Sequence, residues 1–195
     1  SINLTASDRS VLYALIAGKK SISAVESENH KSWWKKIFLT HYFLADTSSH
    51  ILLNNLQPWS LLNINFRNIH HEIKTSSKVE AVIRKKLKTL KITDFILFHA
   101  SSQYNYKIYP QNLRDILLSD LSKLGIPILM TGGKDSIDEG IKKQLPSFIN
   151  IFDFIGETSL EEFFALSKLS LGYVGMDTLN MHIAASQNKR IFAIF

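Results

Sequence analysis

Polar and charged side chains gather at four points of the C-terminal half, each where an apolar run gives way to a helical pattern. The strongest motif is Gly-Met-Asp-Thr-Leu-Asn-Met-His at 175–182, between a predicted strand and a predicted helix. The first turn of a helix presents unpaired N–H groups and partial positive charge, which favours a phosphate. Thr178 adds a hydroxyl, and His182 lies one turn further on. Capping of the helix by Asp177 explains the same residues on spacing alone.

A second cluster follows an apolar run at 99–107, where His-Ala-Ser-Ser leads to Lys107. The hydroxyls of Ser101 and Ser102 can donate to a diphosphate, and the ammonium group of Lys107 can neutralise it as a point charge. A plain polar loop before a helix accounts for this motif equally well. The motif is weak by itself.

Two further turns carry polar residues of the same kind. The segment 131–135 reads Thr-Gly-Gly-Lys-Asp, and paired glycines permit a close approach of the backbone to a ligand. The segment 156–159 reads Gly-Glu-Thr-Ser, and Ser159 with Glu162 has the spacing of a helix capping box. Neither is a P-loop or a complete dinucleotide-binding fingerprint. Each segment is also explained as an ordinary turn, but four such turns on one rim of a sheet predict a ligand site.

Composition narrows the classes of partner and cofactor. The chain has no cysteine, which excludes thiolate metal sites and a cysteine nucleophile, and its histidines lack ligand spacing, so no metal is expected. His70–His71 is predicted to be a surface pair. The net charge of +6 fits a solvated basic surface or an anionic partner. Basic clusters without interleaved aromatic residues argue against nucleic acid. No apolar stretch reaches the roughly 18 residues of a membrane span.

The second half alternates between strand and helix patterns. Predicted strands cover 95–99, 128–130, 151–154, 170–174 and 190–195, and predicted helices cover 112–124, 136–144, a segment from 159, and a segment from 177 or 178 to about 187. Near-continuous apolar strands are typical of a parallel sheet buried on both faces. We therefore predict an α/β fold of the doubly wound kind, in which ligands bind at the carboxyl ends of the strands.

The first half is less regular. Its pattern predicts a helix at 8–17 ending at Gly18, a strand at 21–25, a helix at 48–56 stopped near Pro58, and a helix at 78–90. The polar stretch 74–77 suggests a domain boundary, with one domain at 1–76 and another at 77–195. The first domain has too few predicted strands for a complete α/β domain, so we expect it to be incomplete. The chain is expected to be a fragment.

The order of these motifs resembles glycosyltransferase family nine, the lipopolysaccharide heptosyltransferases. His-Ala-Ser-Ser followed by Lys-x-Tyr-Pro is similar to the start of that family's C-terminal domain. Gly-Glu-Thr-Ser-Leu at 156–160 resembles its Gly-Lys-Thr-Ser-Leu segment, and the run 177–185 resembles its Asp-Ser/Thr-Gly-x-Met-His-x-Ala-Ala stretch. The resemblance is specific from about residue 95 to the end and weak in the first half.

The resemblance implies a GT-B fold, with two Rossmann-like domains facing across a cleft. Residues 1–76 would then be a remnant of the acceptor-side domain, and 77–195 the nucleotide-sugar-binding domain. The implied reaction is metal-independent, inverting transfer of heptose from ADP-heptose to the lipopolysaccharide inner core. It requires no cofactor besides the donor, and takes place at the cytoplasmic face of the inner membrane with an anionic lipid A core acceptor.

The resemblance also assigns roles to individual residues. Ser101, Ser102 and Lys107 would hold the donor phosphates, and Thr158 would lie by the adenine. The sugar and diphosphate would be held by Asp177, Thr178 and His182. Lys107 and the helix start at Thr178 would stabilise the leaving diphosphate. The predicted catalytic residues are Lys107 and His182.

Departures from the family pattern keep alternatives open. Leu179 stands where the family has glycine, which would narrow the donor pocket or change the sugar, and Tyr109 replaces a tryptophan. No segment matches the family's N-terminal loop that carries its proposed base, and neither Asp8 nor Asp46 is expected to replace it. A non-catalytic nucleotide-sugar-binding module and a GT-B transferase with another donor are therefore the alternatives.

Overall fold

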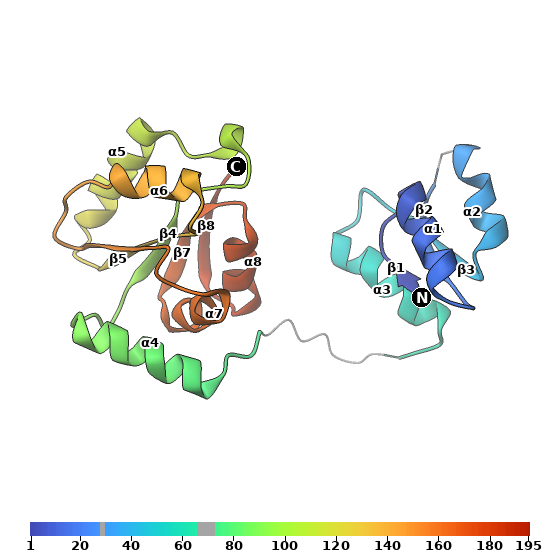
Figure 1. Cartoon of the computed structure of the whole chain (residues 1–195), viewed down its shortest axis with the longest axis horizontal. Coiled ribbons are helices and arrows are strands. Elements are labelled where there is room, and N and C mark those ends of the chain that lie inside the picture. The colour runs from blue at the N-terminus through green and yellow to red at the C-terminus, as the bar shows by residue number, and fades with distance from the viewer. Residues whose placement is uncertain (28–29, 66–72) are drawn as a thin grey trace. The chain divides into compact units, whose positions relative to one another are not determined.

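The computed structural model describes residues 1–27, 30–65 and 73–195 (Figure 1). The chain divides into two compact units, Ser1–Ile69 and His70–Phe195, which are described separately below. The predicted surface pair His70–His71 lies outside the described residues. No helix in the described part of the chain combines the length and apolar character needed to cross a membrane.

The first unit contains a parallel sheet of three strands in the order β1-β2-β3. Its strands are β1 (Ile2–Asn3), β2 (Ile22–Glu26) and β3 (His41–Ala45), and its α-helices are α1 (Asp8–Ala17), α2 (Trp33–Phe38) and α3 (Ile51–Leu61). Val11 of α1, Val25 of β2 and Leu39 after α2 form one buried cluster. Ile22, Ala24 and Phe43 form a second cluster. Because neighbouring residues of β2 contribute to different clusters, this strand is covered on both faces.

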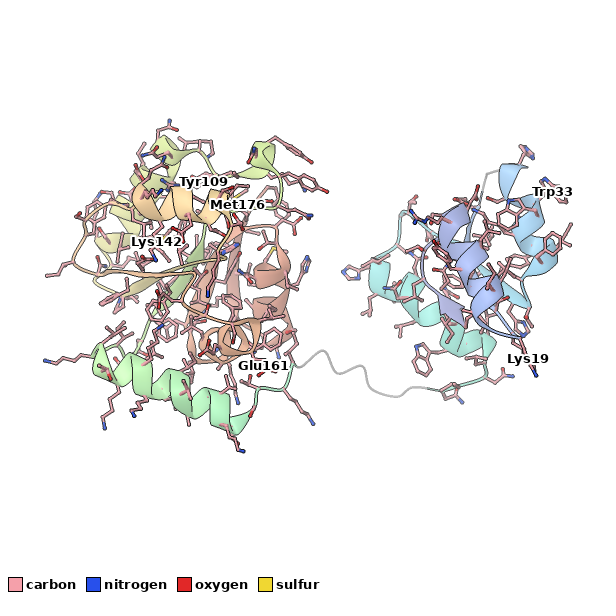
Figure 2. All side chains as sticks on the ribbon, in the orientation of Figure 1. Lys19, Trp33, Tyr109, Lys142, Glu161 and Met176 are labelled. Atoms are coloured by element: carbon pink, nitrogen blue, oxygen red, sulfur yellow. The ribbon has the colours of Figure 1, made fainter. Side chains whose placement is uncertain are left out.

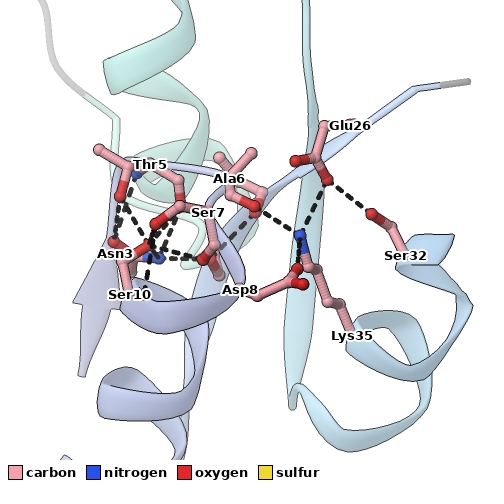
Figure 3. Close-up of polar contacts among 11 residues, drawn as sticks. Asn3, Thr5, Ala6, Ser7, Asp8, Ser10, Glu26, Ser32 and Lys35 are labelled. Carbon is pink, nitrogen blue, oxygen red and sulfur yellow. Dashed lines mark hydrogen bonds and ion pairs between the residues drawn. The ribbon is translucent and has the colours of Figure 1, made fainter. Parts of the chain in front are cut away.

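A buried lysine ties three segments of this unit together (Figure 3). The Lys35 side chain is 1% exposed, and its Nζ lies 2.7 Å from Asp8 Oδ1 and 2.9 Å from Glu26 Oε2. It also donates to the Ala6 carbonyl oxygen at 2.6 Å. Burial opposes the charge of Lys35, but hydrogen bonds and charges from Asp8 and Glu26 together raise its pKa. A buried charge needs such partners, so this cluster fixes how α2 sits on α1 and β2.

The second unit contains a five-stranded sheet in the order β6-β5-β4-β7-β8, and every neighbouring pair is parallel. Its strands are β4 (Ile96–His99), β5 (Ile128–Gly132), β6 (Ile151–Ile155), β7 (Gly172–Met176) and β8 (Arg190–Ile194). Its α-helices are α4 (Ser77–Thr89), α5 (Gln111–Ser122), α6 (Ser136–Lys143), α7 (Leu160–Leu169) and α8 (Leu179–Ser186). The predicted doubly wound parallel sheet is confirmed.

Helices cover both faces of this sheet, as Figure 1 shows. Leu97 of β4 packs in a cluster with Leu87 of α4, Leu166 of α7 and Ile183 of α8. The next residue, Phe98, packs in the opposite cluster with side chains of α5 and α6. Successive side chains of a strand point to opposite faces, which is why an uninterrupted apolar run forms this strand.

Most predicted elements are present, with small shifts at their ends. The predicted helix at 8–17 matches α1, and Ser159 and Glu162 form both hydrogen bonds of the predicted capping box at α7. The strand predicted at 170–174 begins two residues later than expected, as β7. The reason is that the backbone N–H of Ser170 donates to the Leu166 carbonyl oxygen and still belongs to the end of α7.

The prediction of a helix at 48–56 stopped near Pro58 is wrong at both ends. Ser48 and Ser49 donate hydrogen bonds to the Asp46 carboxylate, which holds them in a turn outside the helix. The helix α3 continues through Pro58, and the Leu62 N–H donates to the Pro58 carbonyl oxygen. Proline removes one donor from a helix, but its carbonyl still accepts.

Three elements of the first unit were not predicted: β1, α2 and β3. Two residues form β1, which is too short to give a pattern. β3 reads His-Tyr-Phe-Leu-Ala, an apolar run of which only Phe43 is buried. The first unit therefore has more parallel strands than its sequence indicated.

We expect Gly175→Ala to destabilise the second unit by about 2–4 kcal/mol, because a Cβ there would collide with the backbone of His99 on β4. A matched control is Gly140→Ala in α6, where a Cβ meets nothing within 4 Å. That change should stabilise by about 0.5–1 kcal/mol through helix propensity. Urea unfolding followed by circular dichroism measures both. Equal stability of the two variants would contradict the tight approach of β7 to β4.

Candidate functional site

The site lies where the strand order of the second unit reverses. From β4 the chain adds β5 and β6 on one side, and then β7 and β8 on the other. The loops after β4 and β7 therefore leave the sheet in opposite directions and open a crevice at the carboxyl ends of the strands. A hollow of about 650 Å³ occupies this position. Its lining comes from the loops after β4, β5 and β7 and from the starts of α6 and α8: His99, Ser101, Ser102, Gln103, Tyr104, Lys107, Asp135, Ser136, Ile137, Asp138, Asp177, Thr178, Leu179 and Asn180.

Five of the seven predicted donor-binding residues line this hollow: Ser101, Ser102, Lys107, Asp177 and Thr178. They come from the loops after β4 and β7, and 72 residues separate the end of the first strand from the start of the second. Figure 2 labels Met176, the last residue of β7, at this end of the sheet. The fold thus brings the two strongest sequence motifs to one place.

The other two predicted residues, Thr158 and His182, are not among the lining residues. Thr158 follows β6, which is two strands away from β4 in the sheet. His182 lies on the exposed side of α8, with a side chain that is 67% exposed and Nε2 at 3.5 Å from Asp177 Oδ1. His182 is therefore linked to the hollow through Asp177.

The start of α8 faces the hollow with its cap side chain unused. Thr178 occupies the N-cap position but its hydroxyl makes no capping hydrogen bond, and it lies 3.5 Å from the Tyr173 hydroxyl. A helix start without a side-chain cap leaves its first N–H groups available to an acceptor. Together with Lys107 across the hollow, it gives the site two sources of positive potential.

The hollow also contains a buried histidine that sequence reasoning did not select. His99 Nδ1 lies 2.9 Å from the Thr131 carbonyl oxygen, which can only accept, so Nδ1 carries a proton. Burial lowers the pKa of His99, although the charge of Asp138 opposes this shift. In the neutral ring Nε2 accepts, and the Ser101 hydroxyl donates to it at 3.3 Å. Asn180 Nδ2 is placed 3.0 Å from Nδ1. Two donors would then face each other, so we assign the amide in the flipped orientation, with its oxygen toward the protonated nitrogen.

Asp138 explains the paired glycines at 132–133 differently from the sequence prediction. Asp138 is buried, and its carboxylate accepts a hydrogen bond from the Gly133 N–H at 2.5 Å. A Cβ at Gly132 would collide with this carboxylate, so Gly132 makes room for Asp138. Asp138 Oδ1 has no hydrogen-bond partner among the described residues. Asp135, whose pKa is lowered mainly by the Asp138 N–H, caps α6 beside it.

The sequence carried one signal for these missed residues. His99 is a polar residue at the end of a buried apolar strand, and in open α/β sheets ligands bind at the carboxyl ends of the strands. Asn180 and Asp138 sit in the first turns of helices, where polar residues are common for capping, so their types gave no signal. The described residues contain no group of three or more acidic or histidine side chains placed to hold a metal ion.

We expect the stability of the second unit to fall as pH drops below about 6.5, the ordinary pKa of histidine. Burial lowers the folded-state pKa of His99, so the unfolded chain takes up its proton first and acid favours unfolding. One such group contributes at most about 1.4 kcal/mol per pH unit. His99→Gln should flatten this part of the curve of unfolding free energy against pH.

The matched control is His182→Gln, which removes an exposed imidazole from the same unit. Urea unfolding at several pH values between 5 and 8 measures the slope for each variant. An equal flattening in both variants would contradict the role assigned to burial at His99.

Comparison with known proteins bears on the whole chain. Residues 5–195 match the model of glycosyltransferase family 9 (heptosyltransferase). No curated protein sequence matches. Among solved structures, a family 9 glycosyltransferase from Veillonella parvula has a TM-score of 0.77 and 19% identity, covering 98% of this chain and 55% of its own.

Two E. coli structures are similar. The heptosyltransferase WaaC with ADP has a TM-score of 0.74 and 14% identity, and the ADP-heptose lps heptosyltransferase II has a TM-score of 0.71 and 15% identity. Each is covered over 61% of its length, while this chain is covered completely. The chain therefore spans between half and two thirds of the length of these three proteins. Because the family model matches nearly all of the sequence, the chain belongs to glycosyltransferase family 9, the heptosyltransferase family.

Proposed function

We propose that this chain forms the donor-binding part of a glycosyltransferase that moves heptose from ADP-heptose to the inner core of lipopolysaccharide. The reaction inverts the anomeric centre and needs no metal. The observation that carries the proposal is the hollow at the strand reversal, which gathers Lys107, two serine hydroxyls and the start of α8. Hydroxyls, an ammonium group and a helix start are the groups that bind a diphosphate.

The structural neighbours support the class of ligand. One similar structure is WaaC with ADP, and another, at a TM-score of 0.64 and 14% identity, is WaaC with ADP-2-deoxy-2-fluoro heptose. A volume of about 650 Å³ lies within the usual range of small-ligand pockets, roughly 300–1,000 Å³. An ADP-sugar is therefore the donor that we assign to this hollow.

The chemical role of the site is to stabilise charge on the leaving diphosphate. Lys107 supplies a full positive charge, and the start of α8 at Thr178 supplies oriented N–H groups. While His99 is neutral, the proton of the Ser101 hydroxyl is directed to Nε2, which leaves Ser102 as the freer hydroxyl donor. Asp177 and His182 are proposed to hold the sugar, and Thr158 to lie by the adenine.

The acidic residues considered as a base in the first unit are poorly suited to it. Asp8 is held in an ion pair with the buried Lys35 at 2.7 Å. Hydrogen bonds from Ser48 and Ser49 lower the pKa of Asp46 to about 2. An effective general base has a pKa nearer the working pH, so neither carboxylate is assigned this role. We place the base outside this chain, and a non-catalytic binding module remains the alternative.

The proposed acceptor is the anionic lipid A core, met at the cytoplasmic face of the inner membrane. The net charge of +6 is consistent with approach to an anionic surface. Nucleic acid is not proposed as a partner.

Calorimetry should detect binding of ADP and ADP-heptose to this chain. Lys107→Ala is expected to weaken both by about 10–100-fold, because a charge-assisted hydrogen bond contributes roughly 1.5–3 kcal/mol. Lys143→Ala, an exposed lysine of α6 that does not line the hollow, is the matched control and should leave both affinities unchanged. Absence of binding to the folded wild-type chain, or equal loss in the two variants, would reject the assigned donor site.

A transferase with another nucleotide sugar is the second candidate, favoured by one observation. Leu179 lines the hollow with a side chain that is 60% exposed, where the family pattern has glycine. If ADP-heptose is the donor, Leu179→Gly should improve its affinity relative to that for ADP, because the space beside the diphosphate widens. Leu160→Gly is the matched control, since Leu160 is the first residue of α7 as Leu179 is of α8. The second candidate would be favoured if Leu179→Gly improved the affinity for a different ADP- or UDP-sugar relative to that for the free nucleoside diphosphate, but did not do so for ADP-heptose.

A further inference from the structure

The positive charge of this chain is concentrated in one short segment. Residues 74–91, which contain α4, hold seven of the 23 lysines and arginines and one of the 17 acidic residues. This segment therefore has a net charge of +6, equal to that of the whole chain. Residues 92–195, the rest of the second unit, hold nine basic and eleven acidic residues. One edge of the unit is thus strongly basic and its body slightly acidic.

The helix α4 turns these charges outward. Ile83 and Leu87 are buried in the core cluster that also contains side chains of α7. Lys78, Lys85 and Lys88 are exposed and recur at helical spacing on the opposite side. Nitrogen-tipped side chains project from α4 away from the sheet in Figure 2.

These three lysines are free of ion pairs within the described residues, unlike other cations nearby. Glu80 accepts hydrogen bonds from Arg84 at 2.7 Å and from Lys168 of α7 at 3.0 Å, and the hydrogen bond from Lys168 is the main cause of its lowered pKa. Lys86 lies 3.6 Å from Glu157. The only acidic residue of the segment is therefore already paired, and none of the ion pairs among the described residues involves the outward lysines.

Beside this face is a hollow of about 500 Å³ with mixed lining. Arg84, Lys88 and Lys91 supply its charge. Leu87 and Ile92, both nearly buried, and Leu169 supply apolar walls. Such a lining matches a phosphate next to an apolar group, and a phospholipid has both, in its head group and its acyl chains.

We propose that the outward face of α4, defined by Lys78, Lys85 and Lys88, docks the protein on a bilayer surface that carries anionic phospholipids, with Lys91 just beyond the helix and one phosphate held beside Arg84. Charge complementarity carries the argument, because each lysine or arginine near such a surface contributes about 1 kcal/mol. The choice of a bilayer rather than another polyanion rests on the proposed function, whose acceptor is a lipid. Exposed Val82, between these lysines on the same face, adds apolar contact.

Vesicle flotation tests the proposal. The wild-type chain is expected to float with phosphatidylcholine vesicles that contain phosphatidylglycerol, and not with pure phosphatidylcholine. Lys78→Ala/Lys85→Ala/Lys88→Ala should weaken that binding on the order of 100-fold. Binding of the wild type should vanish at 1 M salt, where the Debye length is about 3 Å.

The matched control is Lys19→Ala/Lys20→Ala/Lys143→Ala, which removes three exposed lysines elsewhere without an ion pair among the described residues. It should float like the wild type. Equal flotation of both triple variants, or binding to soluble polyphosphate or duplex DNA without binding to vesicles, would overturn the proposal.

ADP binding is measured on the same samples. An α4 variant that still binds ADP is folded, so its failure to float concerns this surface alone. Loss of ADP binding in the wild type with normal flotation would instead count against the proposed function.

Discussion

The close contact between β4 and β7 is the constraint on which the candidate site depends. These strands are neighbours in the sheet although 72 residues separate the end of one from the start of the other. Gly175 pairs with His99, and the absence of a side chain lets the two backbones meet there. The loops beyond them then diverge. The serines and Lys107 lie on one side of the opening and the start of α8 on the other, so the distance across the site is set by backbone packing.

A buried histidine at the end of β4 also lines the hollow. His99 ends β4 and reaches across to the Thr131 carbonyl of β5, so one ring touches two of the strands that frame the site. Its other nitrogen orients the Ser101 hydroxyl. Burial lowers the pKa of the ring and so favours the neutral form, in which Nε2 accepts. The binding surface is therefore shaped by a protonation state as well as by sterics.

Sequence reasoning predicted the second unit well because its signals are local. Apolar runs such as Phe95–Phe98 and the Ser159–Glu162 capping box follow from nearest neighbours, and both are present. The hollow was predictable as a rim, since parallel strands place their loops on one side. His99 and Asn180 were not, because their contacts join residues distant in sequence. Asp138 was not, because an acidic residue in the first turn of a helix is common for capping. In the first unit, β3 was not predicted, and only one of its residues is buried. The helix α3 was predicted to stop near Pro58, but it continues through this residue.

The separation of charge in the second unit also makes it an electric dipole. A +6 segment on α4 and a body with two more acidic than basic residues have their centres of charge at different places. Near a charged surface, the electric field exerts a torque on this unit before the two make contact. The torque turns the positive α4 segment toward negative charge. The number of orientations sampled during an encounter falls accordingly. An arrangement of lysines that adds little to folding thus governs the direction from which this unit meets its surroundings.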